Sequence, residues 1–259
     1  MSELEFLGAL HVELLRRSEL RPEHPAHELF QASTVQALLA GAYEGDVTLE
    51  QLLEHGDLGL GTLNGLDGEL IVLDGEVWKA ELDCTLTRPP PSARTPYAVV
   101  AEFSPGPPAE LSQRLAGEDL EGWLRSIGRI TDRPDAIRID GRFESIHIRS
   151  VPKQHKPYPS LAEAIAHQHI VELEDVAGTM VGFRFADPLD GIEMTGFHLH
   201  FATDDRKRGG HVLSYTVLEG MVLIDEATDL HVELPPAVAA PLHGTALDQH
   251  EISRLETDS

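Results

Sequence analysis

Hydrophobic and polar positions alternate over much of the chain, and the pattern predicts many short strands with a few helices between them. Residues 2–20 carry apolar side chains at a nearly helical spacing that stops before Pro22, which predicts a helix. Residues 28–43 are typical of a strand, a turn and a helix, with Ser33 or Thr34 as the cap. A short helix from Thr48 to about Leu53 follows, because Thr48 and Gln51 have the spacing of a capping box.

The pattern changes at residues 59–82, where short apolar runs are separated by Asp-Gly pairs at 67–68 and 74–75. Asp-Gly favours hairpin turns, so this stretch is predicted to be an antiparallel meander. The same reasoning predicts the other elements: strands at 95–103, 136–140, 142–151, 176–185, 196–204, 209–227 and 229–235, and helices at 109–130, after Ser160, and at 246–256.

Together these elements predict an α/β protein of the mixed α+β kind, with largely antiparallel sheets and flanking helices. A chain of 259 residues is long enough for two modest domains. We expect a division near residue 140, which gives an N-terminal α/β domain with a mixed sheet (1–140) and a strand-rich C-terminal domain (141–259).

The charge balance narrows the possible partners. The formal net charge is −24, which repels nucleic acids and anionic membrane surfaces, so neither is expected as a partner. An anionic substrate would need a local cationic centre. The N-terminus has no basic segment followed by an apolar core, and no apolar run approaches the roughly 20 residues that span a bilayer. These features predict a cytoplasmic protein.

Three histidines in the C-terminal half form a candidate metal site. His198 and His200 are two residues apart in an alternating segment, so on a strand both imidazoles point to the same face. Gly209-Gly210 would allow a tight return, and His211 then opens the next strand of a β-hairpin. Three neutral nitrogen ligands with a fourth position open are typical of catalytic zinc, although another divalent transition metal also fits.

Other histidines weaken the argument from spacing alone. The chain has 14 of them, so a His-X-His pair can arise by chance. His167 and His169 have the same spacing but lie on a predicted helix, where positions i and i+2 point apart. A cysteine-based zinc cluster is excluded, because Cys84 is the only cysteine.

Several stretches in the same order resemble the bacterial acetolactate decarboxylases. They are residues 29–75 (LFQAS to VLDG), IRSVPKQHKPYPSL at 148–161, VAGTMVGFRF at 176–185 and GFHLHFATDDRKRGGHVL at 196–213. The resemblance implies two α/β domains with mixed sheets, a homodimer, zinc as the cofactor, and conversion of 2-acetolactate to acetoin and CO2 in acetoin and butanediol biosynthesis.

The resemblance also assigns residues to the site. It implies that His198, His200 and His211 hold the zinc, and it maps Glu69 of LDGEL, Arg149 of RSVPKQ and Thr62 of GTL to the active site. A glutamate of the C-terminal tail also enters the family's site. Glu256 is the choice here, with Glu251 as the close alternative.

The chemistry of this substrate needs such groups. Loss of CO2 from a β-keto acid leaves an electron pair that the ketone must accept, which gives an enediolate that a metal ion stabilises. Arg149 can bind the carboxylate or steady the enediolate. Glu69 or Glu256 can deliver the proton that completes acetoin. Organic cofactors are not expected, because the sequence has no phosphate loop and no dinucleotide fingerprint.

The sequence leaves two alternatives open. A cupin-like metalloenzyme also carries His-X-His and a later His, but it expects a glutamate four or five residues after the pair, where this chain has Asp204 and Asp205. A non-catalytic member that has kept the fold is expected to lack one of the site residues, and His198, His200, His211, Arg149 and Glu69 are all present.

Overall fold

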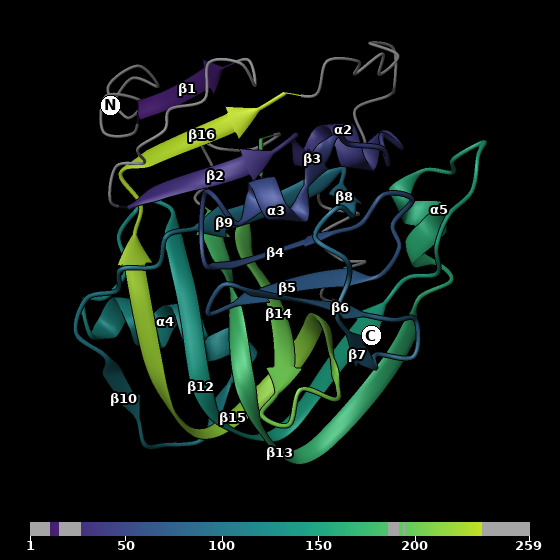
Figure 1. The fold of residues 1–259 in the computed structure, drawn as a ribbon. Helices are drawn as coiled ribbons and strands as arrows, with labels where there is room; N and C mark the ends of the chain where they lie inside the picture. The colour runs from purple at the N-terminus through teal and green to yellow at the C-terminus, as the bar shows by residue number, and fades with distance from the viewer. Residues whose placement is uncertain (1–10, 16–26, 186–191, 194, 235–259) are drawn as a thin grey trace.

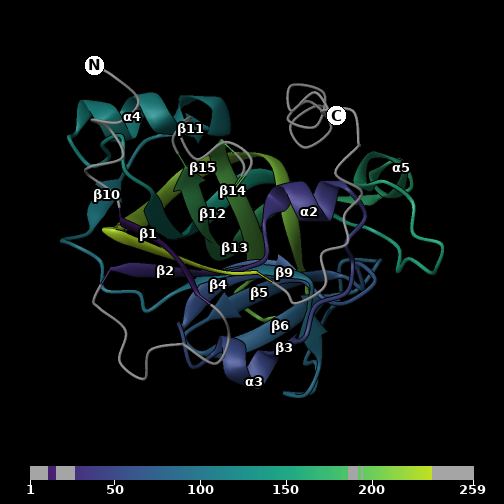
Figure 2. The same ribbon diagram turned by 90° about the horizontal axis from the view of Figure 1, so that it is seen from above.

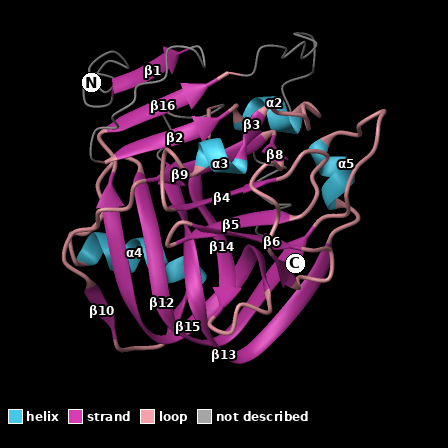
Figure 3. Cartoon of the chain, in the orientation of Figure 1, coloured by secondary structure: helices cyan, strands magenta, loops and turns pink. Residues whose placement is uncertain are grey.

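Two β-sheets pack against each other with their strands crossing steeply, and they account for most of the described structure (Figure 1). This computed structural model describes residues 11–15, 27–185, 192–193 and 195–234. Strands dominate, and the helices between them are short (Figure 3). The predicted fold class, mixed α+β with largely antiparallel sheets, is confirmed.

The first sheet has eight strands and is mixed, because β1 and β2 both run parallel to β16 while its other pairings are antiparallel. In spatial order its strands are β1 (His11–Leu15), β16 (Asp229–Glu233), β2 (Glu28–Ala32), β9 (Tyr97–Ala101), β4 (Leu58–Thr62), β5 (Glu69–Leu73), β6 (Glu76–Ala80) and β7 (Leu86–Thr87).

The second sheet is antiparallel and contains the longest described strands. Its order is β10 (Ala109–Leu111), β15 (Gly209–Glu226), β12 (Asp135–Ser150), β13 (His169–Phe185) and β14 (Gly196–Thr203), and β11 (Leu115–Ala116) pairs with β15. The start of β15 also pairs with β14, which closes these strands into a ring. A separate pair consists of β3 (Val47–Thr48) and β8 (Arg94–Thr95).

The main hydrophobic core lies between the two sheets. Leu60, Ile71 and Val99 of the first sheet belong to one buried cluster with Val181 and Phe183 of the second. Full burial of side chains of this size contributes about 1.5–3 kcal/mol each. Because side chains alternate along a strand, Glu69 projects from β5 on the same side as Ile71, toward the second sheet.

Short helices cover the outer faces and one end of the sheets. Figure 2 shows α3 (Leu49–Leu52) on the face of the first sheet that points away from the second, where Leu49 and Leu52 pack with Leu70 and Val72 of β5. The second sheet is covered by a 3-10 turn (Gly117–Asp119) and α4 (Leu120–Ser126). The helices α2 (Val35–Leu39) and α5 (Leu161–Ile165) contact each other at one end.

Local signals predicted several of these elements correctly. Thr48 and Gln51 form the reciprocal capping box of α3, and Ser160 caps α5 with Glu163 as its partner. Thr34 caps α2 by accepting a hydrogen bond from the backbone N–H of Ala37. Between β5 and β6, Asp74 and Gly75 have φ values of 53° and 74°, as a two-residue type I′ hairpin requires.

Other predicted elements are wrong. Residues 11–15 form strand β1 beside β16, where the prediction was a helix, because pairing with a neighbouring strand outweighs helical spacing. The predicted helix at 109–130 is helical only from residue 117 to 126, since its first part supplies β10 and β11 to the edge of β15. The two strands predicted at 136–140 and 142–151 are one strand, β12, with register shifts near Phe143.

The second histidine pair and the expected domain boundary both lie in or next to long strands. The histidine pair at 167 and 169 does not lie on a helix, because α5 ends at Ile165 and His169 begins β13; both side chains are exposed. Residue 140 lies within β12, and β16 returns to the first sheet from the C-terminal half. The division into domains at 1–140 and 141–259 stays a prediction. The rest of the helix predicted at 2–20 and the helix predicted at 246–256 fall outside the described residues.

Among the described residues, no helix combines the length and the apolar character needed to cross a membrane.

Candidate functional site

Strand geometry brings three histidines together at one end of the interface between the sheets. His198 and His200 are two residues apart on β14 and project from the same face of the strand, as their spacing predicts. His211, at the start of β15, lies directly opposite His200 in the ladder. One potential ligand atom from each of the three residues lies within 4.8 Å of the other two. The predicted hairpin therefore brings the predicted trio together.

The chain turns back between these strands earlier than predicted. The turn is formed by residues 204–207, where Arg206 has a φ of 54°, while Gly209 and Gly210 already belong to β15. A Cβ on Gly209 would lie 2.5 Å from the carbonyl oxygen of Phe201, and one on Gly210 would lie 2.6 Å from that of Arg149. These glycines allow close approach of neighbouring backbones, rather than the return itself.

The orientation of two rings fits a shared metal ion. Nδ1 of His200 lies 2.7 Å from the carbonyl oxygen of Leu70 and donates to it, which leaves Nε2 as the ligand atom. Nδ1 of His211 lies 3.3 Å from that Nε2. Two nitrogens that bind one tetrahedral zinc at about 2.0–2.1 Å are separated by about 3.4 Å. The separation therefore matches two nitrogens that ligate the same ion.

Burial keeps these imidazoles in the form that binds metals. The pKa of His200 is well below its usual value because of burial and the neighbouring His198. The pKa of His211 is well below its usual value because of burial and the nearby guanidinium of Arg149. A neutral imidazole is the ligating species, so the environment favours metal binding at neutral pH.

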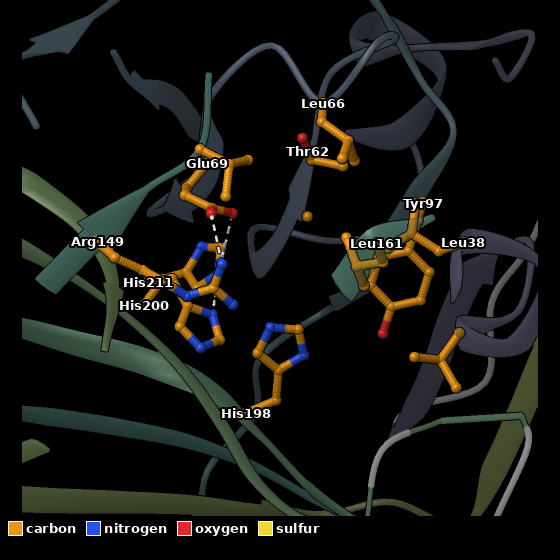
Figure 4. A pocket seen from close by; sticks show the side chains of 13 residues that line it. Leu38, Thr62, Leu66, Glu69, Tyr97, Arg149, Leu161, His198, His200 and His211 are labelled. Carbon is orange, nitrogen blue, oxygen red and sulfur yellow. Dashed lines mark hydrogen bonds and ion pairs between the residues drawn. The ribbon is translucent and has the colours of Figure 1, made fainter. Parts of the chain in front are cut away.

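The three histidines line a pocket, and Arg149 and Glu69 complete its polar side (Figure 4). Arg149 is paired with His211 across β12 and β15, and its side chain is 5% exposed. Glu69 reaches in from β5, with its Oε1 3.9 Å from an Nη of Arg149 and its Oε2 3.8 Å from Nε2 of His200. The carboxylate therefore lies between the guanidinium and the histidine cluster.

Thr62 lines the same pocket, next to Glu69 in the ladder of β4 and β5. Its hydroxyl donates a 2.7 Å hydrogen bond to the carbonyl oxygen of Gly68. The hydroxyl proton is thus directed to the backbone, and the oxygen keeps lone-pair capacity to accept a hydrogen bond from a ligand.

Asp67 connects the loop before Glu69 to the segment after Arg149. Lys79 and Lys153 donate to its two oxygens at 2.8 and 2.9 Å. Burial raises the pKa of Asp67, but these hydrogen bonds outweigh it, so the pKa is lowered. Both lysines thus lie beside the site and connect the segments that carry Glu69 and Arg149.

Sequence reasoning missed Tyr97 and Glu193. Tyr97, on β9, lines the pocket, and its hydroxyl donates to the carboxylate of Glu193, which in turn faces His198. Tyr97 lies in a strand that was predicted, but nothing in a single sequence pairs it with a residue 96 positions away. The apolar wall of the pocket was missed as well; it consists of Val35, Leu38, Leu66, Val151 and Leu161.

The C-terminal glutamate is the one predicted site residue that the structure does not place. Glu256 and its alternative Glu251 lie outside the described residues. Their roles stay predictions.

Comparisons with known proteins agree on one family. Residues 29–240 match the family model described as alpha-acetolactate decarboxylase. The alpha-acetolactate decarboxylase of Methylococcus capsulatus is 38% identical over 212 residues, which covers 82% of each chain. That of Klebsiella aerogenes is 36% identical over 229 residues, covering 87% of this chain and 88% of its own. The crystal structure of alpha-acetolactate decarboxylase from Bacillus subtilis strain 168 matches with a TM-score of 0.83 at 33% identity, covering 89% of this chain and 99% of its own.

Proposed function

This chain belongs to the alpha-acetolactate decarboxylase family, and from that premise we propose that it converts 2-acetolactate to acetoin and CO2 in the pocket described above. The observation that carries the proposal is the convergence, in one buried pocket, of a histidine trio, a guanidinium and a carboxylate. The cupin-like alternative is not favoured, since the match to the family model extends over residues 29–240.

The histidine trio fits a divalent transition metal. Three neutral nitrogen donors, with Nε2 of His200 and Nδ1 of His211 at the separation of co-ligands, are typical of a catalytic zinc site. When bound, such an ion supplies a Lewis acid that stabilises the negative charge developing on the substrate oxygens. Zinc is the ion we propose, and other first-row divalent ions suit the same imidazoles.

Arg149 binds the anionic part of the substrate in this account. Its guanidinium is buried and lies 3.9 Å from the Glu69 carboxylate, so it supplies a positive charge inside the pocket of this strongly acidic chain. A guanidinium can bind a carboxylate through two parallel hydrogen bonds and thereby fix the orientation of the bond that breaks. After CO2 leaves, the guanidinium lies beside the negative charge that remains on the substrate.

Glu69 delivers the proton that completes the reaction. Loss of CO2 leaves the bonding electron pair on the substrate as an enediolate, and one proton must be added to the carbon that carried the carboxylate. The carboxyl group of Glu69 is directed into the pocket, within 3.9 Å of Arg149 and 3.8 Å of His200, and this position supports the proposed role. Thr62 accepts a hydrogen bond from the substrate hydroxyl. Glu256, or Glu251, is proposed from the resemblance as a second carboxylate.

The apolar wall opposite these groups suits the methyl groups of the substrate. Leu38 and Leu161, on α2 and α5, face the pocket across from Arg149 and Glu69 (Figure 4). A pocket with one apolar side and a few convergent polar groups is typical of a small-molecule site. A homodimer, a cytoplasmic location and a place in acetoin and butanediol biosynthesis stay predictions from the sequence and its resemblance.

Measuring acetoin and CO2 formed from racemic 2-acetolactate tests the proposal, before chelation, after chelation and after zinc is added back. We expect both products in equal amounts, lost on chelation and restored by zinc. Absence of acetoin from folded, zinc-loaded protein would contradict the proposed reaction.

A further inference from the structure

Two imidazoles of the site are supported in different ways. His200 donates from Nδ1 to the backbone carbonyl of Leu70. His198 instead presents its Nδ1 to a side chain, with Oε1 of Glu193 at 3.9 Å. The second oxygen of that carboxylate accepts a hydrogen bond from the hydroxyl of Tyr97. One ligand thus has a backbone oxygen behind it, and another has a carboxylate held by a tyrosine.

The Glu193 carboxylate is fully buried, which makes its location significant. Its side chain is 0% exposed, the side chain of His198 is 10% exposed, and Tyr97 is 2% exposed. Moving a carboxylate out of water is costly unless hydrogen-bond donors compensate it. The Tyr97 hydroxyl is one such donor, and the rings of Tyr97 and His198 lie nearly parallel, at 16°.

We propose that Glu193, held by Tyr97, is a positioning residue that accepts the Nδ1–H of His198 and thereby directs Nε2 of His198 to the metal. Figure 4 shows one nitrogen of the His198 ring turned toward His200 and His211, and the other turned toward the side of Tyr97. A carboxylate behind a ligating histidine fixes the tautomer and the ring orientation and raises the basicity of the ligand. This inference rests on the proposed function, because it assumes that the trio binds a metal.

The proposed hydrogen bond requires the contact between His198 and Glu193 to shorten when the metal binds. At 3.9 Å the contact between Nδ1 and Oε1 is longer than a hydrogen bond. In the zinc-loaded protein it must shorten to hydrogen-bond length, about 2.7–3.2 Å. Tyr97 holds the carboxylate from its other oxygen, so the imidazole is the group that adjusts.

The chain contains a matched control for this contact. Nδ1 of His231 on β16 lies 3.9 Å from Oε1 of Glu28 on β2, and both side chains are buried. Neither residue lines the pocket. Removing the Glu28 carboxylate therefore removes a buried histidine–carboxylate contact of the same length from the first sheet, away from the pocket.

The experiment compares zinc affinity, measured by competition with a chromophoric chelator, in the wild type, Glu193→Ala, Glu193→Gln, Tyr97→Phe and Glu28→Ala. Removal of a carboxylate behind a ligating histidine lowers metal affinity by about 10–100-fold, and we expect that loss for Glu193→Ala. Glu193→Gln should lose less, because its amide oxygen can still accept the Nδ1–H. Glu28→Ala should bind zinc as the wild type does. The visible spectrum of the Co2+-loaded protein should change in Glu193→Ala and stay unchanged in Glu28→Ala.

The outcomes distinguish failure of the positioning role from failure of the proposed reaction. A wild type that binds no metal would overturn both. A wild type that binds zinc, with Glu193→Ala equal to it in affinity and in Co2+ spectrum, would overturn the positioning role and leave the proposed reaction standing. Equal losses in Glu193→Ala and Glu28→Ala would also overturn it, since general destabilisation would then explain them. If Glu193→Ala does not fold, Tyr97→Phe decides: it should lose affinity because the Glu193 carboxylate is no longer held, and wild-type affinity with an unchanged Co2+ spectrum contradicts the inference.

Discussion

Nε2 of His200 and Nδ1 of His211 face each other at 3.3 Å, from residues that are direct partners in the ladder of β14 and β15. The separation is set by strand register, which a one-residue slip would destroy, because it would turn one of the imidazoles to the opposite face. The ligands thus stand on paired strands rather than on loops, and such sites hold their geometry closely.

Replacing His211 with alanine should remove metal binding and activity together. Loss of the ion removes a Lewis acid that contributes several kcal/mol, so turnover should fall by about a thousandfold or more. Metal content and acetoin formation are measured on the same sample. His169→Ala, at an exposed position on β13, is the control and should keep both. A His211→Ala protein that retains its metal would remove this residue from the ligand set.

Arg149→Lys should keep the metal but lose most of its turnover. A lysine supplies a point charge without the planar fork of donors, and about a hundredfold loss in kcat/KM corresponds to one lost charge-assisted hydrogen bond. Steady-state kinetics beside metal analysis checks this. Arg142→Lys is the control, because Arg142 is exposed on the same strand. Normal turnover in Arg149→Lys would exclude a catalytic role for the guanidinium.

Glu69→Gln should also leave the metal in place, because the amide has nearly the same shape but no proton to deliver. General acid catalysis contributes about 10²- to 10⁴-fold, so a loss of kcat in that range is expected. Glu76→Gln, at an exposed position on the paired strand β6, should behave as the wild type. Unchanged kcat in Glu69→Gln would move the proton donor to another group, with the C-terminal glutamates next to be tested.

The metal-stripped protein should lose stability as the pH falls below 6.5. The pKa values of His200 and His211 are lowered from 6.5 in the folded state, chiefly by burial, so the unfolded chain binds protons that the folded chain does not. Stability therefore rises with pH through this window, by about 1.4 kcal/mol per pH unit for each such group. Denaturant unfolding at several pH values measures the slope. His211→Gln should reduce this slope by about 1.4 kcal/mol per pH unit, the contribution of one proton. An unchanged slope would contradict the lowered pKa of His211.

The sequence predicted those parts of the fold that local chemistry decides. The capping box at Thr48, the helix cap at Ser160 and the Asp74-Gly75 turn depend on neighbouring residues, and each was predicted correctly. The helices predicted over residues 11–15 and 109–116 were wrong, because the conformation of these segments depends on strands that are distant in sequence. Residues 11–15 pair with β16, and residues 109–116 contribute two short strands that pair with β15. Helical spacing of apolar residues cannot reveal such pairing.

The site shows the same division. His198, His200 and His211 could be grouped from strand alternation, because they lie on one hairpin. Glu69 could be connected with them only through the family resemblance, since it comes from the other sheet. Glu193 had neither signal, and its hydrogen bond to Tyr97 of the first sheet is visible only in the folded structure.

The central claim, that the three imidazoles hold the ion on which decarboxylation depends, is tested most directly by titrating chelator-stripped protein with zinc while acetoin formation is measured. We predict that activity is absent without metal, rises in proportion to the zinc bound and reaches its maximum at one equivalent per chain. Full activity in the stripped protein, or zinc bound at one equivalent in His198→Ala with normal acetoin formation, would contradict it.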